Sequence, residues 1–312
     1  MSYIRNVAVI GCGQLGRRHI QGLGKSSKKI MVHVYDVAPN SLDVCKAFVT
    51  DISEDIGNLK FAFYDDLIPL GSATAKYDLI IVASTAHERP TLLGQLISLA
   101  ESRHWIIEKP LSQSPAELDK LTALLPANGV WVNHFRRAVT WHQNLQSVFS
   151  SKKINQITVK SPYIGIGCNI SHLVDLVEYW TSQTPVTVDV SGLDDEWHDS
   201  KRPGFKEISG TLRIIFSGGT KLLVVSDDMT SETIIEGTFG DVNHSFSIDE
   251  DAGTVTIDGV KGDHGRIQFQ SELTGIVFDE LDQTDSTNLT SYAVAAKCYP
   301  PVVAALLTHW QG

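Results

Sequence analysis

The first part of the chain alternates short apolar runs with amphipathic segments. The apolar runs predict strands at residues 6–11, 31–36, 59–64, 77–84, 104–110 and 129–133, and helices are predicted at 15–23, 88–100 and 115–125. Val and Ile are nearly unbroken in these strands, which indicates that both faces are covered. This pattern is typical of a doubly wound α/β domain, in which a parallel sheet lies between two helix layers.

After residue 150 the strands alternate apolar and polar positions, which is typical of an open, mainly antiparallel sheet. Ser217–Thr220 and Asp251–Gly253 lie where hairpin loops are needed. One helix is predicted at Cys168–Trp180, and a second at Ser291–Trp310, which Pro300 and Pro301 should break or restart. This half is predicted to be an α+β domain.

A chain of 312 residues is long enough for two domains. We expect a dinucleotide-binding domain at 1–132 and a substrate-binding and oligomerisation domain at 133–312. Residues 211–216 and 221–226 have apolar side chains to spare for the outer face of the second sheet. An uncovered apolar sheet face is an aggregation hazard, so a homodimer or homotetramer packed through it is expected.

The charge balance favours a small-molecule partner. The chain has 26 Lys and Arg against 36 Asp and Glu, a net charge of -10, which argues against nucleic acid and a polybasic membrane contact. No signal-peptide pattern opens the sequence and no apolar run reaches a membrane span, so a cytoplasmic location is predicted. The four scattered cysteines have no metal-site spacing and are expected to be free thiols, with no metal.

A glycine pattern follows the first strand and opens a helix. Gly11, Gly13 and Gly16 form a full GxGxxG, and Asp36 ends the second strand twenty residues after Gly16. Together they predict a Rossmann dinucleotide site, in which Asp36 accepts from the adenosine ribose and the glycines admit the pyrophosphate. The backbone N–H groups at Gln14 and Leu15, at the start of the helix, would face the phosphates. Because a carboxylate repels a 2'-phosphate, NAD is predicted over NADP; the alternative is a glycine turn that serves packing alone.

Polar residues also follow the fourth and fifth strands. Ser84, Thr85 and His87 stand at the carboxyl edge and could contact the cofactor, or could cap the following helix. The fifth strand ends in Glu108-Lys109-Pro110, two charges that are costly to bury, next to a proline that cannot continue a ladder.

With this motif and the glycine fingerprint, the chain resembles the glucose-fructose oxidoreductase, inositol dehydrogenase and MocA (Gfo/Idh/MocA) family, strongly over residues 3–137 and more loosely beyond. The resemblance implies that Lys109 lies beside the nicotinamide and the substrate hydroxyl, that Glu108 and Pro110 shape the turn, and that the Lys109–Pro110 bond is cis. It also implies that an open antiparallel sheet covers the site. The alternative is a Lys109 paired with Glu108 in solvent.

The helix at 168–180 has two stripes at helical spacing. Its apolar stripe is Leu173, Leu176, Val177 and Trp180, and its polar stripe is Cys168, His172, Asp175 and Tyr179. The resemblance implies an Asp and a His four residues apart that point at the substrate; His172 matches the His, whereas Cys168 stands at the Asp position. Asn169 or Asp175 would then compensate, or the substrate differs from a simple polyol.

Asn-rich versions of this segment resemble family members from surface-polysaccharide and sugar-nucleotide pathways. A histidine satisfied at a domain contact is the other interpretation of His172. Arg136 follows the sixth strand, as do Asn133 and Arg137, and would suit a substrate phosphate or carboxylate, or equally an interdomain salt bridge.

These features predict an NAD-dependent oxidoreductase that transfers hydride between nicotinamide and a hydroxyl or keto carbon of a sugar or sugar derivative. Lys109 and His172 would share proton transfer and substrate positioning. The alternatives are a non-catalytic NAD(H)-binding regulator and a reductase of a non-sugar carbonyl or imine on the same scaffold.

Overall fold

A computed structural model describes residues 4–73, 76–150, 152–201, 204–227, 232–240, 244–263 and 265–311. The chain divides into two compact units. Unit 1 contains residues 1–138 and 268–294, and unit 2 contains 139–267 and 295–312. This division differs from the predicted one at residue 132 because a late segment, 268–294, returns to the first unit.

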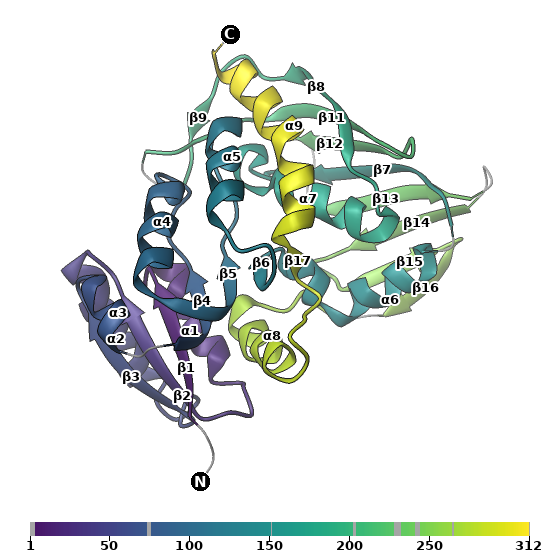
Figure 1. The fold of residues 1–312 in the computed structure, drawn as a ribbon. Helices are drawn as coiled ribbons and strands as arrows, with labels where there is room; N and C mark the ends of the chain where they lie inside the picture. Colours follow the sequence, from purple (N-terminus) through teal and green to yellow (C-terminus); the bar gives the residue numbers. More distant parts are fainter. Residues whose placement is uncertain are drawn as a thin grey trace. The chain divides into compact units, whose positions relative to one another are not determined.

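Unit 1 is a doubly wound α/β fold, as predicted (Figure 1). Its elements are β1 (Arg5–Ile10), α1 (Gln14–Leu23), β2 (Ile30–Tyr35), α2 (Pro39–Asp51), β3 (Leu59–Tyr64), α3 (Ile68–Ala73), β4 (Lys76–Val82), α4 (Arg89–Leu99), β5 (Glu101–Ile107), α5 (Pro115–Leu124), β6 (Val130–Val132), η1 (Phe135–Ala138), α8 (Gln270–Thr284) and β17 (Thr290–Ser291). The strand order is β17-β6-β5-β4-β1-β2-β3, with β1 to β6 parallel and β17 antiparallel to β6.

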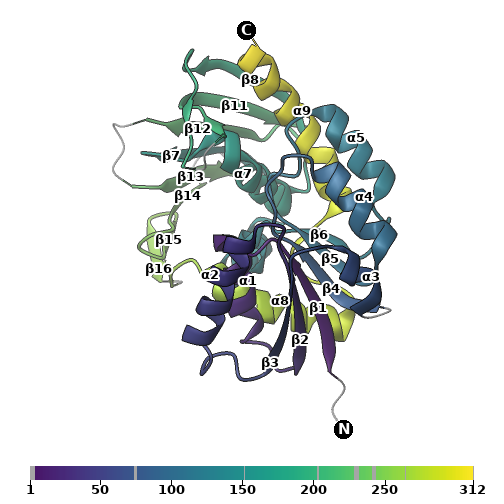
Figure 2. The same ribbon diagram turned by 90° about the vertical axis from the view of Figure 1, so that its left-hand side faces the viewer.

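Helices cover both faces of this sheet. In Figure 2, α1 and α2 lie on one side and α4 and α5 on the other. On the first side, Val7, Val9 and Ile20 form a buried core with Val277 and Phe278 of α8. The near-continuous apolar character of the strands is thus explained by burial on both faces.

Unit 2 is built on an open sheet. Its elements are α6 (Thr140–Phe149), β7 (Ile154–Ser161), α7 (Ile166–Thr181), β8 (Pro185–Leu193), β9 (His198–Asp199), β10 (Lys206–Glu207), β11 (Gly210–Phe216), β12 (Lys221–Ser226), β13 (Ile234–Phe239), β14 (His244–Asp249), β15 (Thr254–Ile257) and β16 (Val260–Asp263). The sheet order is β16-β15-β14-β13-β7-β12-β11-β8, antiparallel except for the β7–β12 pair. Both predicted hairpin loops are present, between β11 and β12 and between β14 and β15.

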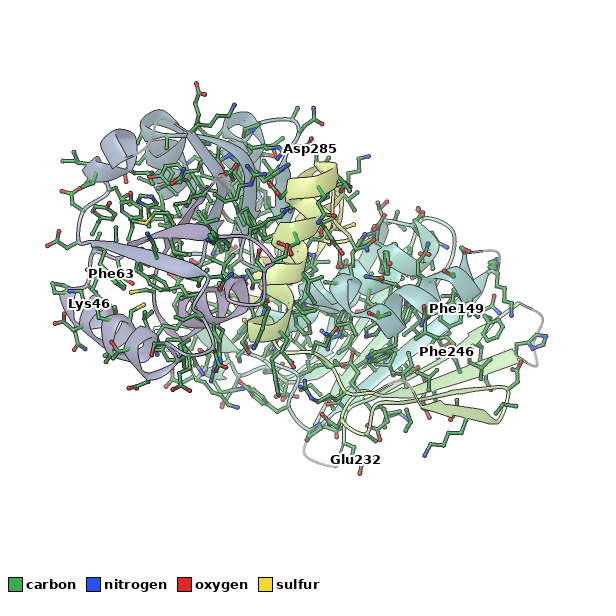
Figure 3. All side chains as sticks on the ribbon, turned by 90° about the horizontal axis from the view of Figure 1, so that it is seen from below. Lys46, Phe63, Phe149, Glu232, Phe246 and Asp285 are labelled. Carbon is green, nitrogen blue, oxygen red and sulfur yellow. The ribbon has the colours of Figure 1, made fainter. Side chains whose placement is uncertain are left out.

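An aromatic core fills the inner face of this sheet. The Phe149 ring lies 4.8 Å from Phe246 and 5.3 Å from Trp180, and Figure 3 shows Phe149 and Phe246 side by side. The outer face is mainly polar: Glu236 stands opposite Thr158 and Ser247 across the neighbouring strands. Apolar exposure on β11 is concentrated at Ile215, which is 41% exposed.

The last helix, α9 (Tyr292–Gln311), corrects one prediction. It runs through Pro300 and Pro301 without a break. Proline removes backbone hydrogen bonds, but Tyr299 and Val302, on either side of the pair, are each 4% exposed. Packing of this helix therefore outweighs the local preference for a break.

Candidate functional site

The glycine loop after β1 has the geometry that a dinucleotide site requires. Gly11 has φ +89, and a Cβ there would lie 3.1 Å from the Ser84 backbone nitrogen. A Cβ on Gly16 would overlap the Gly11 carbonyl oxygen, so both positions need glycine. At Gly13 no atom of the described residues lies within 4 Å of an added Cβ, which leaves the loop open to a ligand. Gly11 thus makes the turn, Gly16 permits the close packing of the helix, and Gly13 leaves open the approach for a ligand.

Asp36 lies against this loop, as its spacing predicts. Its Oδ2 accepts from the Cys12 backbone N–H at 2.8 Å, and its Oδ1 accepts from the Ala38 N–H at 3.0 Å. Asp36 is half-buried, so the carboxylate keeps acceptor positions for a ribose hydroxyl. Gly13 is the N-cap of α1 and provides no side-chain cap, so the N–H groups at Gln14 and Leu15 are suited to phosphate oxygens.

The Cys12 thiol, inside the loop, belongs to the protein core. Cys12 and Cys45 are both buried. A hydrogen bond with Cys45, then burial, then the charge of Asp36 raise the pKa of Cys12. The thiol is therefore protonated and contributes packing rather than nucleophilic chemistry.

The loop between β4 and α4 holds Ser84, Thr85 and His87. Ser84 is half-buried, whereas Thr85 and His87 are exposed. The N-cap of α4 is Glu88, and no side-chain cap is found there in the described part of the chain, so capping of α4 does not explain the polar run. The loop starts at the switch point between β1 and β4, where ligands of such sheets bind.

The charged end of β5 is buried on one side. Glu108 is 2% exposed, and its Oε1 bonds to His19 Nε2 at 2.8 Å and accepts from Asn133 Nδ2 at 2.5 Å. This contradicts the alternative in which Glu108 pairs with Lys109 in solvent. Lys109 is half-buried, and the Lys109–Pro110 bond is cis, as the resemblance implied.

A polar network behind Lys109 extends from Glu108 to α8. His19 Nδ1 lies 3.0 Å from Thr274 Oγ1, and Asn133 Nδ2 also donates to Gln270 Oε1 at 2.7 Å. Burial alone would raise the pKa of Glu108, but the hydrogen bond and charge of His19, with Asn133 and Lys109, outweigh it and hold that pKa below its usual range. Glu108 is therefore an ionised carboxylate whose Oε1 is held by His19 and Asn133.

Arg89, the first residue of α4, ties the strand ends together. It is 0% exposed, and its guanidinium donates to the carbonyl oxygens of Ser84 at 2.7 Å, Pro110 at 2.9 Å and Glu108. Neither Arg89 nor His19 is found by motif reasoning. The one signal in the sequence is that each is an ionisable residue on the side of its helix, α1 or α4, that faces the sheet.

In unit 2, α7 holds the predicted substrate residues. The apolar stripe is confirmed, since Leu173, Leu176, Val177 and Trp180 are all buried. His172 and Asp175 are also buried, whereas Cys168 and Asn169 are half-buried. Asn169 Nδ2 donates to the Ile164 carbonyl oxygen at 2.7 Å, which fixes the amide at the start of the helix.

Arg136 is on η1, in unit 1, and is half-buried. Its guanidinium lies 5.3 Å from the centre of the Phe135 ring. Within the described ranges no group of three or more His, Cys, Asp or Glu residues is placed to hold a metal ion. No helix among those residues is both long and apolar enough to cross a membrane.

The strand order, the glycine loop and Asp36 define unit 1 as a dinucleotide-binding Rossmann domain. Residues 5–135 match the family described as oxidoreductase family, NAD-binding Rossmann fold. Over these residues the chain is similar to the Gfo/Idh/MocA family of oxidoreductases, and its cofactor is NAD. A comparison with curated protein sequences found no match.

Solved structures share the fold over both units. An oxidoreductase from Agrobacterium radiobacter in complex with NAD+, L-tartaric acid and magnesium is 16% identical, with TM-score 0.73 and coverage of 99% of this chain and 97% of that one. UDP-N-acetylglucosamine 3-dehydrogenase from Acidithiobacillus ferrooxidans is 15% identical, with TM-score 0.71 and coverage of 98% and 96%. Apo scyllo-inositol dehydrogenase from Lactobacillus casei is 13% identical, with TM-score 0.66 and coverage of 100% and 96%. Identities this low establish the fold alone.

Proposed function

We propose that this NAD-binding oxidoreductase transfers hydride between nicotinamide and a hydroxyl or keto carbon of a sugar or sugar derivative, including nucleotide-linked sugars of surface-polysaccharide pathways. The observation that carries the proposal is the position of Lys109 at the carboxyl edge of the sheet, beyond β5 and beside β4, the strand that leads into the Ser84 loop. Arg89 and the buried Glu108 hold the backbone on both sides of Lys109.

Bound NAD supplies the hydride acceptor or donor. Lys109 takes the proton from a substrate hydroxyl during oxidation and returns it during reduction. His19 and Asn133 hold Oε1 of the buried Glu108, and the pKa of this carboxyl is below its usual range, so proton exchange falls to Lys109 rather than to its neighbour. His172 shares the proton transfer or positions the substrate, and Asn169, Asp175 and Arg136 bind its polar groups.

The similar solved structures support a hydroxylated substrate. They are a scyllo-inositol dehydrogenase, a UDP-N-acetylglucosamine 3-dehydrogenase and an oxidoreductase in complex with L-tartaric acid. Scyllo-inositol, UDP-N-acetylglucosamine and L-tartaric acid are all small, polar molecules with secondary hydroxyl groups. A buried His and Asp on α7, near a half-buried Asn, offer the donors and acceptors that such groups need.

The first test is Lys109→Ala, assayed by nicotinamide absorbance with scyllo-inositol, myo-inositol, L-tartrate and UDP-N-acetylglucosamine. We expect turnover to fall by at least roughly a hundredfold while NADH binding, measured by fluorescence, is retained. Lys120→Ala, at an exposed lysine of α5, is the matched control. Unchanged turnover in Lys109→Ala removes Lys109 from the mechanism.

A cofactor-binding regulator without catalysis is the second candidate. The observation that favours it is Cys168, which stands where the family resemblance places an Asp. A regulator binds NADH but neither oxidises nor reduces any member of the substrate panel. Turnover of any one of these compounds excludes it.

We also propose that the protein is a homodimer or homotetramer packed through the outer face of the unit 2 sheet. Ile215, which is 41% exposed, and the half-buried Leu223 and Val225 provide apolar surface there, among polar neighbours. Light scattering is the measurement, and Ile215→Lys should shift the particle toward a monomer. A wild-type monomer at all accessible concentrations contradicts the proposal.

A further inference from the structure

A second carboxylate lies at the start of α7. Glu207 of β10 stands opposite His198 in the antiparallel strand pair β9–β10, and its side chain is buried, with 4% exposed. Its side chain lies against the first turn of the helix: a Cβ on Gly165 would be 3.1 Å from Glu207 Oε1, and one on Gly167 would be 3.0 Å from Oε2. Two glycines therefore leave the space that this carboxylate occupies.

Glu207 shares that space with the polar residues of the helix start. The same Cβ on Gly165 would be 3.2 Å from Asn169 Nδ2, so the amide and the carboxylate flank one point. Cys168 lies between Gly167 and Asn169 in the same first turn of α7. Glu207, Asn169 and Cys168 thus form one cluster, which we call the α7 cluster.

We propose that Glu207 supplies, from another strand, the substrate-binding carboxylate that Cys168 does not supply from α7. The proposal rests on the proposed function and deepens it, because it assigns a residue that selects hydroxylated substrates. A buried carboxylate accepts strongly from a hydroxyl, and the Asn169 amide beside it contributes to the polar surroundings of the same group. The mainly polar surroundings suit a neutral polyol or sugar ring.

The same arrangement gives a physical reason for Cys168. An Asp at position 168 would bring a second negative charge into the α7 cluster, and two neighbouring carboxylates cannot both ionise without cost. Glu207 and an acid at 168 are therefore alternatives. Cys168→Asp should harm the wild-type protein but restore function to a protein that lacks the Glu207 charge.

Thiol alkylation tests the location of the charge without cofactor or substrate. Cys168 is half-buried, whereas Cys12, Cys45 and Cys298 are buried, so iodoacetamide should modify Cys168 first. Because a nearby carboxylate repels an anionic reagent, Glu207→Gln should speed the reaction of Cys168 with iodoacetate relative to its reaction with neutral iodoacetamide. Glu236→Gln, at an exposed glutamate paired with Lys160 on the outer sheet face, should not. An unchanged ratio of the two alkylation rates in Glu207→Gln overturns the proposal.

Steady-state kinetics on a compound that the wild type turns over test the role. Glu207→Gln should raise KM roughly tenfold to a hundredfold, with kcat changed less than about threefold, and the Glu207→Gln/Cys168→Asp double variant should recover most of that loss. An unchanged KM, or a double variant no better than the single one, refutes the role of Glu207. A wild type inactive on the whole panel contradicts the proposed function instead, and the ratio of the two alkylation rates still decides the position of the carboxylate. Circular dichroism checks that each variant is folded.

Discussion

Replacement of His19 by Leu should destabilise the protein through the residue that it leaves behind. In the wild type, Glu108 is 2% exposed and bonds to His19, which is itself 0% exposed. The variant keeps the Asn133 hydrogen bond but leaves the buried carboxylate without its His19 hydrogen bond. Breaking one side of a buried pair costs about 3–5 kcal/mol, and we expect a loss of this size in the free energy of unfolding at pH 7.

The loss should depend on pH. In the wild type the pKa of Glu108 is held low, so its contribution to stability is present above its unfolded pKa and is lost as the pH falls through the folded value. In the variant the His19 contributions are gone and burial raises that pKa, so its Glu108 is favoured when protonated and loses stability as the pH rises. The stability difference between the two proteins should therefore be largest near pH 7 and shrink as the pH approaches about 4.

Urea unfolding followed by circular dichroism, at several pH values, measures this difference. His244→Leu is the control, because His244 pairs with Asp258 at 2.9 Å on an exposed surface, where ion pairs contribute little. His19→Leu combined with Glu108→Leu should cost less than His19→Leu alone, since no charge is left buried. A loss that is constant across pH, or a double variant less stable than the single one, would refute the reasoning.

Three further predictions concern the cofactor edge. Wild-type protein should bind NADH more tightly than NADPH, and Asp36→Ser should reduce that preference by about tenfold. Nicotinamide fluorescence measures the two dissociation constants, and tighter NADPH binding by the wild type contradicts the role of Asp36. Gly13→Ala should weaken NADH binding by at least about tenfold with little change in Tm, because its Cβ would point into the open space where the cofactor approaches the loop. Gly57→Ala, at an equally open turn, should change neither NADH binding nor Tm. Intact NADH binding in Gly13→Ala disproves the close approach of the cofactor to Gly13. Arg89→Met should lower the free energy of unfolding by about 3 kcal/mol because buried carbonyl oxygens lose their donor, and Arg18→Met, at an exposed arginine, is its control. Equal stabilities of the wild type and Arg89→Met in urea would show that Arg89 does not hold the loop.

Much of unit 1 could be predicted from the sequence because its signals are local. Apolar runs located β3 at its observed bounds, and the glycine spacing placed the loop and Asp36 together. The start of β5 was missed: it begins at Glu101, three residues before the predicted 104, because its first residues are polar and only its last four are buried. Periodicity detects buried faces, not solvated strand ends.

Residues whose role depends on distant segments could not be predicted. His19 and Arg89 gain their meaning from Glu108, which is 89 and 19 positions away. Glu207 is one of two charged residues in a two-residue strand, and the sequence around it has no recognisable pattern. Its position against Gly165 follows from the fold of unit 2 rather than from spacing.

The return of residues 268–294 to unit 1 sets an order for biosynthesis. Thr274 and Gln270 complete the polar network that begins at His19 and Asn133, and β17 pairs with β6. A nascent chain that has emerged only as far as β6 would lack these partners and would leave polar groups without hydrogen bonds in a forming core. The cofactor-binding unit is synthesised first, but it can complete its fold only after almost the whole chain has been synthesised. An isolated fragment of residues 1–132 should therefore not yield a well-folded NAD-binding module.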